Sequence, residues 1–269
     1  MKWKETLPTR PPELMKAQAA AWRLTKRFGF QHPREINVED IACARKVLVV
    51  PGKPQGCEAR LARKGNRGII CVRAGMDETG RRRFSIAHEL GHWELHNDSQ
   101  WFVCSSADLR DYKKSPQEIE ANTFAAELLM PTRMVAPRCE KPLPTLELVK
   151  GIANEFDVSL TAAALRVLYL TKHECVLVAS QGRQIKWWKP NSDRFGVFLE
   201  KGQPLNTESL AWHAFNGEAD ASVMEEVPID AWFPNRPSQA NFAVTEQSLH
   251  LPRYDTVLTL LTIDDADED

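Results

Sequence analysis

The sequence predicts an α+β protein in which a small sheet precedes a helix that carries three histidines. Three observations support this class. Short apolar runs bounded by turn residues alternate with stretches of helical periodicity over the first 170 residues. The segment "RFSIAHELGHWELH" (83–96) places histidines at i, i+4 and i+8 of an amphipathic helix. Strand patterns return after residue 173, so we expect a second α+β domain there.

The elements before the histidine helix follow from local signals. Residues 12–28 combine helix formers with apolar residues at helical spacing, and "INVEDIACARK" predicts a short helix capped by Asn37. "VLVVPG" predicts a strand that Pro51 and Gly52 end. "CEARLAR" and "RGIICVRAG", separated by "KGNRG", predict a hairpin. A small sheet therefore comes shortly before the histidine helix.

A second strong helical pattern follows, "PQEIEANTFAAELLMPTRMV". Ser115 precedes Pro116, and Glu118 comes three residues after the serine, which predicts a capping box with proline at the first helical position. Pro131 should end this helix, and "RCEKPLPT" is expected to be a linker. Residues 145–170 predict two helices joined around Asp157, loosely a helix-turn-helix.

The last part of the chain changes character. "ECVLVAS" and "QIKWWKP" flank Gly182 and predict a hairpin, and "TVLTLLTI" predicts a closing strand. We therefore expect three parts: a first domain over 1–140, a helix-turn-helix-like segment over 141–173, and an α+β domain over 174–269.

Composition fits an ordinary globular protein, with 43% hydrophobic and 26% charged residues. No apolar run approaches the roughly 20 residues of a membrane helix, and the first residues lack a signal-peptide core, so we expect a cytoplasmic protein without membrane contact. The six cysteines form no CxxC pair and are expected to be free thiols. Residues 1–140 carry 24 Lys/Arg and 17 Asp/Glu, against 11 and 19 in 141–269, which favours two domains with different surfaces.

His88 and His92 predict a metal site. Four residues apart on a helix, they project from one face and can reach one ion. Glu89 lies about 100° further round the helix, where it can approach the open side of the metal without being a ligand. Zinc lowers the pKa of bound water towards 7, and a nearby carboxylate can take the proton as the water attacks a carbonyl. Gly91 suggests that another element packs closely against this helix.

The third ligand is less evident. His96 lies about 12 Å from His88 along a straight helix, so the three histidines cannot share one ion, and His96 is expected to cap the helix or contact the next loop. A carboxylate from a second helix is a better candidate. Glu118 could approach the ion while Asn122, one turn on, hydrogen-bonds a ligand. Alternatively Glu118 only caps its helix. If Glu120 and Glu127 are not ligands, they are expected to be solvated. From the residues alone, the choice among these three carboxylates stays open.

Taken together, "RRRFSIAHELGHWELH" and "EIEANTFAAELLMP" resemble the ImmA/IrrE family of zinc metallo-endopeptidases. The resemblance extends over residues 15–263. "TLELVKGIANEFDVSLTAAALRVLYL" is similar to the helical segment that follows the peptidase core in longer members. "CVLVASQGRQIKWWKP" resembles their C-terminal region, which is GAF-like in the IrrE type.

The resemblance implies a zincin-like, gluzincin-type peptidase domain and a GAF-like C-terminal domain. It implies His88, His92 and Glu118 as ligands of zinc and Glu89 as general base. The sequence leaves manganese open as the other candidate metal. Asn122 stands where related peptidases often have Asp. Family members cleave helix-turn-helix repressors and so release stress-response or mobile-element genes. The resemblance therefore implies such a repressor as the substrate.

The alternative is a DNA-binding or signal-sensing transcription regulator that keeps a peptidase-like fold without proteolysis. Residues 145–170 and the basic run Arg81–Arg83 favour it, although that run is expected to be a solvated strand edge or a substrate contact. Residues 150–168 carry only Lys150 and Arg166 as basic side chains, too few to grip phosphates. The C-terminal domain could bind a signal, its tryptophans lining a pocket or, as is more common, forming the core. The intact motif favours the peptidase.

Overall fold

The computed structural model confirms the mixed α+β class. It describes residues 11–76, 79–96, 115–140, 142–193, 196, 198–217, 223–234 and 242–265. The chain divides into two compact units, one within residues 1–134 with 155–159, and the other within 135–154 with 160–269. The boundaries at residues 140 and 173 stay a prediction about domains.

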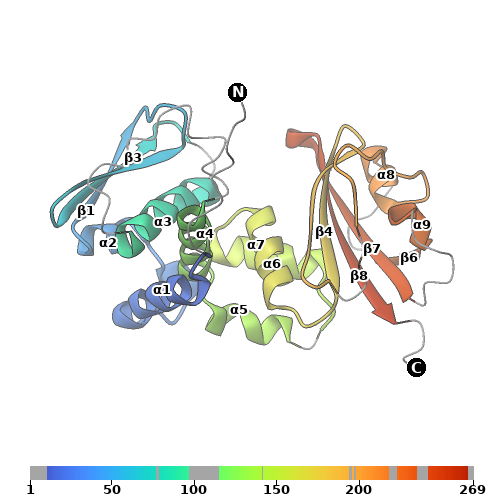
Figure 1. Cartoon of the computed structure of the whole chain (residues 1–269), viewed down its shortest axis with the longest axis horizontal. Helices are drawn as coiled ribbons and strands as arrows, with labels where there is room; N and C mark the ends of the chain where they lie inside the picture. Colours follow the sequence, from blue (N-terminus) through green and yellow to red (C-terminus); the bar gives the residue numbers. More distant parts are fainter. Residues whose placement is uncertain are drawn as a thin grey trace. The chain divides into compact units, whose positions relative to one another are not determined.

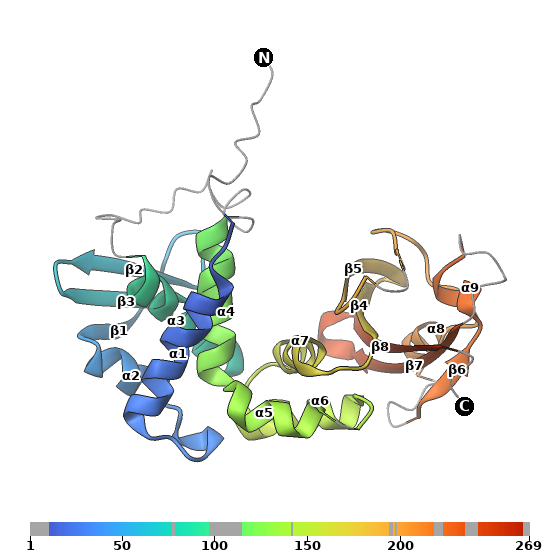
Figure 2. The ribbon, with the colours of Figure 1, turned by 60° about the horizontal axis from the view of Figure 1, so that its bottom comes forward.

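The first unit combines a three-stranded sheet with helices. Its elements are α1 (Leu14–Phe28), α2 (Val38–Ala44), β1 (Val47–Gly52), β2 (Ala59–Lys64), β3 (Arg67–Arg73), α3 (Thr79–Leu95) and α4 (Pro116–Leu129). The strand β3 lies between the other two, parallel to β1 and antiparallel to β2, which confirms the predicted hairpin. Figure 2 shows α1, α3 and α4 gathered beside this sheet.

The core of the first unit lies between the sheet and these helices. It includes Leu61, Ile70 and Val72 from the strands, Ile86 and Leu90 from α3, and Phe124 and Leu128 from α4. Burying such side chains contributes about 1.5–3 kcal/mol each relative to leaving them exposed. The histidine helix is therefore anchored on the sheet by one side, while α4 contacts it on another.

The predicted helix starts are confirmed. Asn37 accepts hydrogen bonds from the backbone N–H groups of Glu39 and Asp40, and Ser115 accepts one from the N–H of Glu118. The helix α4 ends at Leu129, just before Pro131. These caps satisfy N–H groups that have no partner within the helix, so the local sequence alone locates both starts.

Two expectations about this region were wrong. The basic run Arg81–Arg83 is no strand edge, because α3 begins at Thr79 and includes it. Arg83 donates hydrogen bonds to the carbonyls of Ile36 and Phe156, so a tertiary contact holds this first turn. The expected linker also begins too early, since α5 (Thr132–Cys139) extends to the buried Cys139.

The predicted pair of helices is confirmed as α6 (Leu146–Phe156) and α7 (Leu160–Leu170). Between them Asp157 has a positive φ of 53°, the left-handed conformation that Asp tolerates better than most residues. In the described part of the chain, no helix is long and apolar enough to cross a membrane.

The second unit is built on a five-stranded antiparallel sheet. Its remaining elements are β4 (Cys175–Gln181), β5 (Gln184–Pro190), α8 (Leu210–Phe215), β6 (Glu225–Val227), α9 (Ile229–Trp232), β7 (Phe242–Leu251) and β8 (Thr256–Asp265). The strand order is β5-β4-β8-β7-β6, so the predicted hairpin and closing strand are confirmed. Figure 1 shows α8 and α9 beside β7 and β6.

Apolar side chains of one sheet face pack with α8 and α9. A buried carboxylate ties both helices to β7: Glu246 accepts hydrogen bonds from the Ala211 N–H and from Nε1 of Trp232, each at 2.7 Å. On the other face the Leu146 N–H, at the start of α6, donates to Oε1 of Gln247. The sheet is therefore covered on both faces within its own unit.

Candidate metal centre

The crossing of α3 and α4 places the candidate site. Gly91 lies where the helices meet, and a Cβ atom there would be 3.0 Å from the Cα of Ala121 and 3.2 Å from Cδ1 of Phe124. The absence of a side chain lets the two backbones approach closely. The close packing that Gly91 suggested is thus confirmed, and it brings one flank of α4 onto the histidines of α3.

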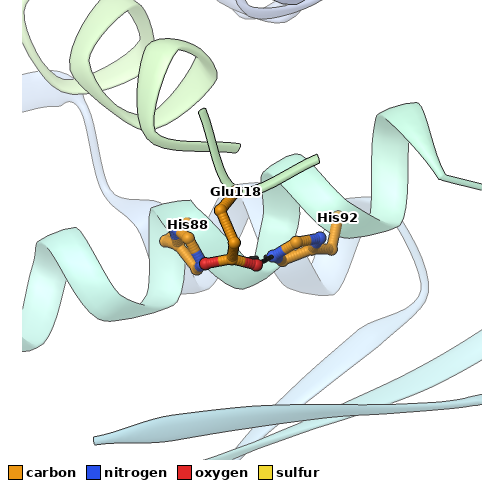
Figure 3. A group of neighbouring side chains, drawn as sticks. All are labelled: His88, His92 and Glu118. Carbon is orange, nitrogen blue, oxygen red and sulfur yellow. Dashed lines mark hydrogen bonds and ion pairs between the residues drawn. The ribbon is translucent and has the colours of Figure 1, made fainter. Parts of the chain in front are cut away.

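Three donor atoms converge beside this crossing. His88 Nε2 and His92 Nε2 lie 3.1 Å apart, and the Glu118 carboxylate reaches between them from α4, as Figure 3 shows. Its Oε2 is 3.2 Å from His88 Nε2, and its Oε1 is 2.8 Å from His92 Nε2. Among the described residues, this is the group of His, Cys, Asp and Glu side chains close enough together to hold a metal ion.

The geometry fits a small tetrahedral cation. Ligands at 2.0–2.1 Å from zinc stand roughly 3.3 Å from one another, close to the separations found here. Glu118 Oε1 is buried and, among the described residues, has no hydrogen-bond partner apart from its contact with His92 Nε2. Two imidazole nitrogens and this carboxylate form the donor set that zinc takes in catalytic sites with an open position. The three residues therefore fit the metal that the sequence predicts.

The charges of this group support one another. Burial lowers the pKa of the His88 imidazole, but contact with Glu118 outweighs burial, with help from the charge of Glu89, so that pKa stands above its usual value. Burial likewise raises the pKa of Glu118, yet the contacts with both histidines lower it to about 2. In the metal-free protein, a charged carboxylate facing protonated imidazole is therefore favoured.

These shifts predict opposite pH dependences with and without metal. The lowered pKa of Glu118 stabilises the folded protein above about pH 4.5, and this stability is lost as pH falls towards 2. The raised pKa of His88 gives stability below 6.5 that is lost as pH rises through the folded-state value. With chelator, we expect Glu118→Gln to lower the free energy of unfolding more at about pH 5.5 than at about pH 8.

With zinc present, we expect Glu118→Gln to lower the free energy of unfolding more at about pH 8 than at about pH 5.5, because zinc needs the unprotonated imidazoles. Urea unfolding of wild type and Glu118→Gln at both pH values, with EDTA and with zinc, measures these differences. Equal effects of the substitution in all four conditions would contradict the assignment of this charge pair.

Glu89 lies beside the three donors but is held differently. The Leu61 N–H of β2 donates a 2.9 Å hydrogen bond to Glu89 Oε2. Burial raises the pKa of the Glu89 carboxyl above its usual value, and the positive charges of His88 and His92 oppose the rise. A carboxyl with a raised pKa is a better proton acceptor than an exposed one, which suits a general base.

Asn122 lies next to the first histidine. Its Oδ1 is 2.9 Å from His88 Nδ1, so it can accept the proton of that nitrogen. This contact leaves the Nε2 lone pair of His88 directed at the common point of the three donors. The predicted position of Asn122, one turn after Glu118, therefore corresponds to a contact with a candidate ligand.

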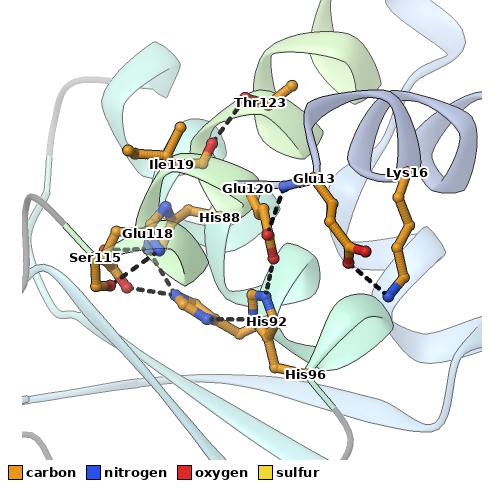
Figure 4. Close-up of polar contacts among 10 residues, drawn as sticks. All are labelled: Glu13, Lys16, His88, His92, His96, Ser115, Glu118, Ile119, Glu120 and Thr123. Atoms are coloured by element: carbon orange, nitrogen blue, oxygen red, sulfur yellow. Dashed lines mark hydrogen bonds and ion pairs between the residues drawn. The ribbon is translucent and has the colours of Figure 1, made fainter. Parts of the chain in front are cut away.

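The structure corrects the expectation for the remaining carboxylates and gives His96 two contacts that the sequence did not predict. Glu120 and Glu127 are not solvated, being only 2% and 5% exposed. Glu120 Oε2 is 2.9 Å from His96 Nε2, and His96 Nδ1 is 3.0 Å from His92 Nδ1, as Figure 4 shows. The loop that His96 was expected to contact lies outside the described residues.

The sequence contained a signal for this contact that local reasoning does not use. Glu118 and Glu120 leave their helix about 200° apart, so they cannot serve the same purpose. His96 lies in register with the two candidate histidine ligands, and Glu120 lies on the other flank of α4 from Glu118. Together they indicate a second set of side chains that contact the ligands without binding the metal. Recognising them requires knowing which face of α4 meets α3.

Known proteins resemble this chain in sequence and in structure. Residues 46–168 match the model of the Peptidase_M78 family, the IrrE N-terminal-like domain. "Uncharacterized immunity region protein 2" of Bacillus phage phi105 is 28% identical over 153 residues, which are 56% of this chain and 91% of that protein. A solved structure called "Mycobacterium tuberculosis transcriptional regulator" matches with a TM-score of 0.56 and 13% identity over 93% of this chain and 76% of its own. At that identity the likeness concerns the fold.

Proposed function

We propose that this protein is a zinc-dependent, site-specific endopeptidase that cleaves a helix-turn-helix transcriptional repressor and so derepresses stress-response or mobile-element genes. The observation that carries the proposal is the convergence of His88, His92 and Glu118 beside Glu89. The family model covers the helices that supply all four residues. The phage relative is named for an immunity region, the kind of region in which a repressor substrate would be encoded.

His88, His92 and Glu118 would hold the metal, with manganese as the alternative to zinc. A bound zinc ion supplies Lewis acidity, which lowers the pKa of a coordinated water towards 7 and polarises a peptide carbonyl. Glu89 then takes the proton of the attacking water on its carboxylate and passes it to the leaving amine. The Leu61 N–H keeps that carboxylate in place, and Asn122 keeps the His88 ring oriented.

The strand β2 offers a place for an extended peptide. It forms one edge of the three-stranded sheet, and its Leu61 N–H points away from β3 towards Glu89. Unpaired backbone groups of an edge strand can pair with another extended chain. A peptide bound along β2 would run past the general base, which is the placement that cleavage within a chain needs.

For the rest of the chain we propose a GAF-like regulatory domain in a cytoplasmic protein. An antiparallel sheet with flanking helices supports the GAF-like assignment. Trp232 is 1% exposed, and Trp188 and Trp212 pack against the same core, which favours a structural role for these tryptophans over a pocket lining. A signal that reaches the peptidase through this domain would then bind elsewhere on it.

A DNA-binding regulator is the second candidate. The name of the structural neighbour, a transcriptional regulator, favours it. The charges oppose it, because Arg166, one of the two basic residues in the helix-turn-helix-like stretch 150–168, is only 4% exposed. Gripping a DNA backbone takes several exposed basic side chains, each neutralising a phosphate. The peptidase therefore remains the better-supported function.

Metal removal tests the proposed activity. The zinc-loaded full chain is expected to cut a helix-turn-helix repressor encoded beside its gene at one bond, and to leave casein intact. Dialysis against a chelator should abolish the cut, and added zinc should restore it, because the donors hold the ion without covalent change. Mass spectrometry of the products identifies the bond.

A matched titration with duplex DNA separates the two candidates. An intact repressor in the presence of the zinc-loaded protein, together with DNA binding that weakens steeply with salt, would replace the peptidase by the regulator. The same assay with manganese in place of zinc identifies the metal that supports cleavage.

A further inference from the structure

A chain of buried polar contacts runs from the candidate metal site to the start of α1. His92 Nδ1 lies 3.0 Å from His96 Nδ1, and His96 Nε2 lies 2.9 Å from Glu120 Oε2. The other Glu120 oxygen, Oε1, accepts a 2.8 Å hydrogen bond from the Glu13 N–H. The two histidines and Glu120 are each at most 8% exposed, so water does not compete strongly for these contacts.

Metal binding by His92 determines where the protons lie along this series of hydrogen bonds. To bind a metal through Nε2, His92 needs its lone pair there, so its proton sits on Nδ1. That proton is donated to His96 Nδ1, because two ring nitrogens 3.0 Å apart need one donor and one acceptor. The proton of His96 then sits on Nε2 and is donated to Glu120, which as a carboxylate only accepts. Each bond therefore has one consistent direction.

The carboxylate at the end of the chain is itself held in place. Glu120 receives the Glu13 N–H on one oxygen and His96 on the other, so both oxygens are engaged by separate elements. The entry to α1, the helix α4 and the end of α3 meet at this side chain, as Figure 4 shows. A carboxylate fixed on both sides orients the imidazole it contacts better than one free to rotate.

We propose that His96 and Glu120 are positioning residues that hold His92 in its metal-binding tautomer and orientation. The inference rests on the proposed metal site. It adds a relay, the hydrogen-bonded series from His92 through His96 to Glu120, which would orient the second histidine as the contact with Asn122 orients the first. Its effect should appear in metal affinity and in the ligand field. Loss of such outer contacts weakens metal binding about 10–100-fold.

Three variants test the relay. His96→Phe keeps an aromatic ring and removes both hydrogen bonds, so zinc affinity should fall about 10–100-fold. His96→Gln offers an amide oxygen to His92 and an N–H to Glu120, and should recover most of that affinity. Glu120→Gln keeps the size of the side chain but removes the charge that fixes the direction of donation in the relay. It should lower zinc affinity about tenfold.

The matched control is Glu127→Gln. Glu127 is a buried carboxylate on the same helix, and it accepts hydrogen bonds from the N–H and the hydroxyl of Thr132. It should lower the free energy of unfolding much as Glu120→Gln does, and leave zinc affinity unchanged. Zinc affinity is measured by competition with a chromophoric chelator, and the ligand field by the visible spectrum of the cobalt(II)-substituted protein, which should shift in His96→Phe and return in His96→Gln.

The outcomes separate the two proposals. A wild-type protein that binds neither zinc nor cobalt overturns the metal site and the relay together. Normal zinc binding by the wild type, with His96→Phe and Glu120→Gln equal to Glu127→Gln in affinity and spectrum, overturns the relay alone. If His96→Phe does not fold, Glu120→Gln against Glu127→Gln decides the matter in the same way.

Discussion

Replacing Glu89 with Gln is expected to lower the rate of peptide-bond cleavage about 10²–10⁴-fold, the usual contribution of a general base. Zinc content should stay at the wild-type level, because Glu89 is not among the three converging donors. The amide keeps the size of the side chain and can still accept the Leu61 N–H, so the fold around β2 should persist. Cleavage of the repressor under single-turnover conditions, with zinc measured on the same sample, gives both values.

Glu118→Gln is the matched comparison. It makes the same chemical change on a proposed metal donor instead of the proposed base, so zinc affinity should fall and cleavage should fall with it. Adding excess zinc should restore part of the activity of Glu118→Gln and none of that of Glu89→Gln. A Glu89→Gln protein that retains zinc and cuts at the wild-type rate would remove Glu89 from the reaction.

Gly91→Val is expected to lower the free energy of unfolding by about 3 kcal/mol, the upper part of the range for overpacking. Its Cβ would lie 3.0 Å from the Cα of Ala121 and 3.1 Å from its carbonyl oxygen, and backbone cannot yield as a flexible side chain can. To relieve the contact, α3 and α4 must move apart, which separates Glu118 from the histidines. Zinc affinity should therefore fall as well.

Gly151→Val provides the control. Gly151 also lies inside a helix, but the nearest atom to a Cβ there is a guanidinium nitrogen of Arg138, 3.9 Å away. The substitution should be neutral or stabilise by a few tenths of a kcal/mol, because valine has the higher helix propensity. Urea unfolding followed by circular dichroism compares the two. Equal effects at both positions would mean that the α3–α4 crossing tolerates a side chain at Gly91.

The sequence predicted most of the elements and the proximity of the two candidate histidine donors because these depend on local spacing. His88 and His92 share a face on any straight helix, and Asn37 and Ser115 cap their helices with neighbours two or three residues away. The third donor was different. Which side of α4 faces the histidines is set by its crossing with α3, so spacing alone could not separate Glu118 from Glu120.

The errors have the same origin. Arg81–Arg83 looked like a surface run because its partners are distant in the sequence, among them the carbonyls of Ile36 and Phe156. These contacts occur in a helix that starts at Thr79, where a strand edge was expected. The burial of Glu120 likewise depends on the backbone of Glu13, 107 residues away, and no local pattern encodes that contact.

The three candidate donors come from two helices, α3 and α4, which are separated along the sequence. An ion held by His92 and Glu118 closes a loop of the intervening chain, as a disulfide between the same positions would. If the ion stayed bound to the unfolded chain, a loop of this size would restrict the unfolded ensemble by about 3.5 kcal/mol in the chain-entropy model. An ion that leaves on unfolding would instead stabilise the folded state by mass action, so the supply of metal would set how long the folded chain survives proteolysis.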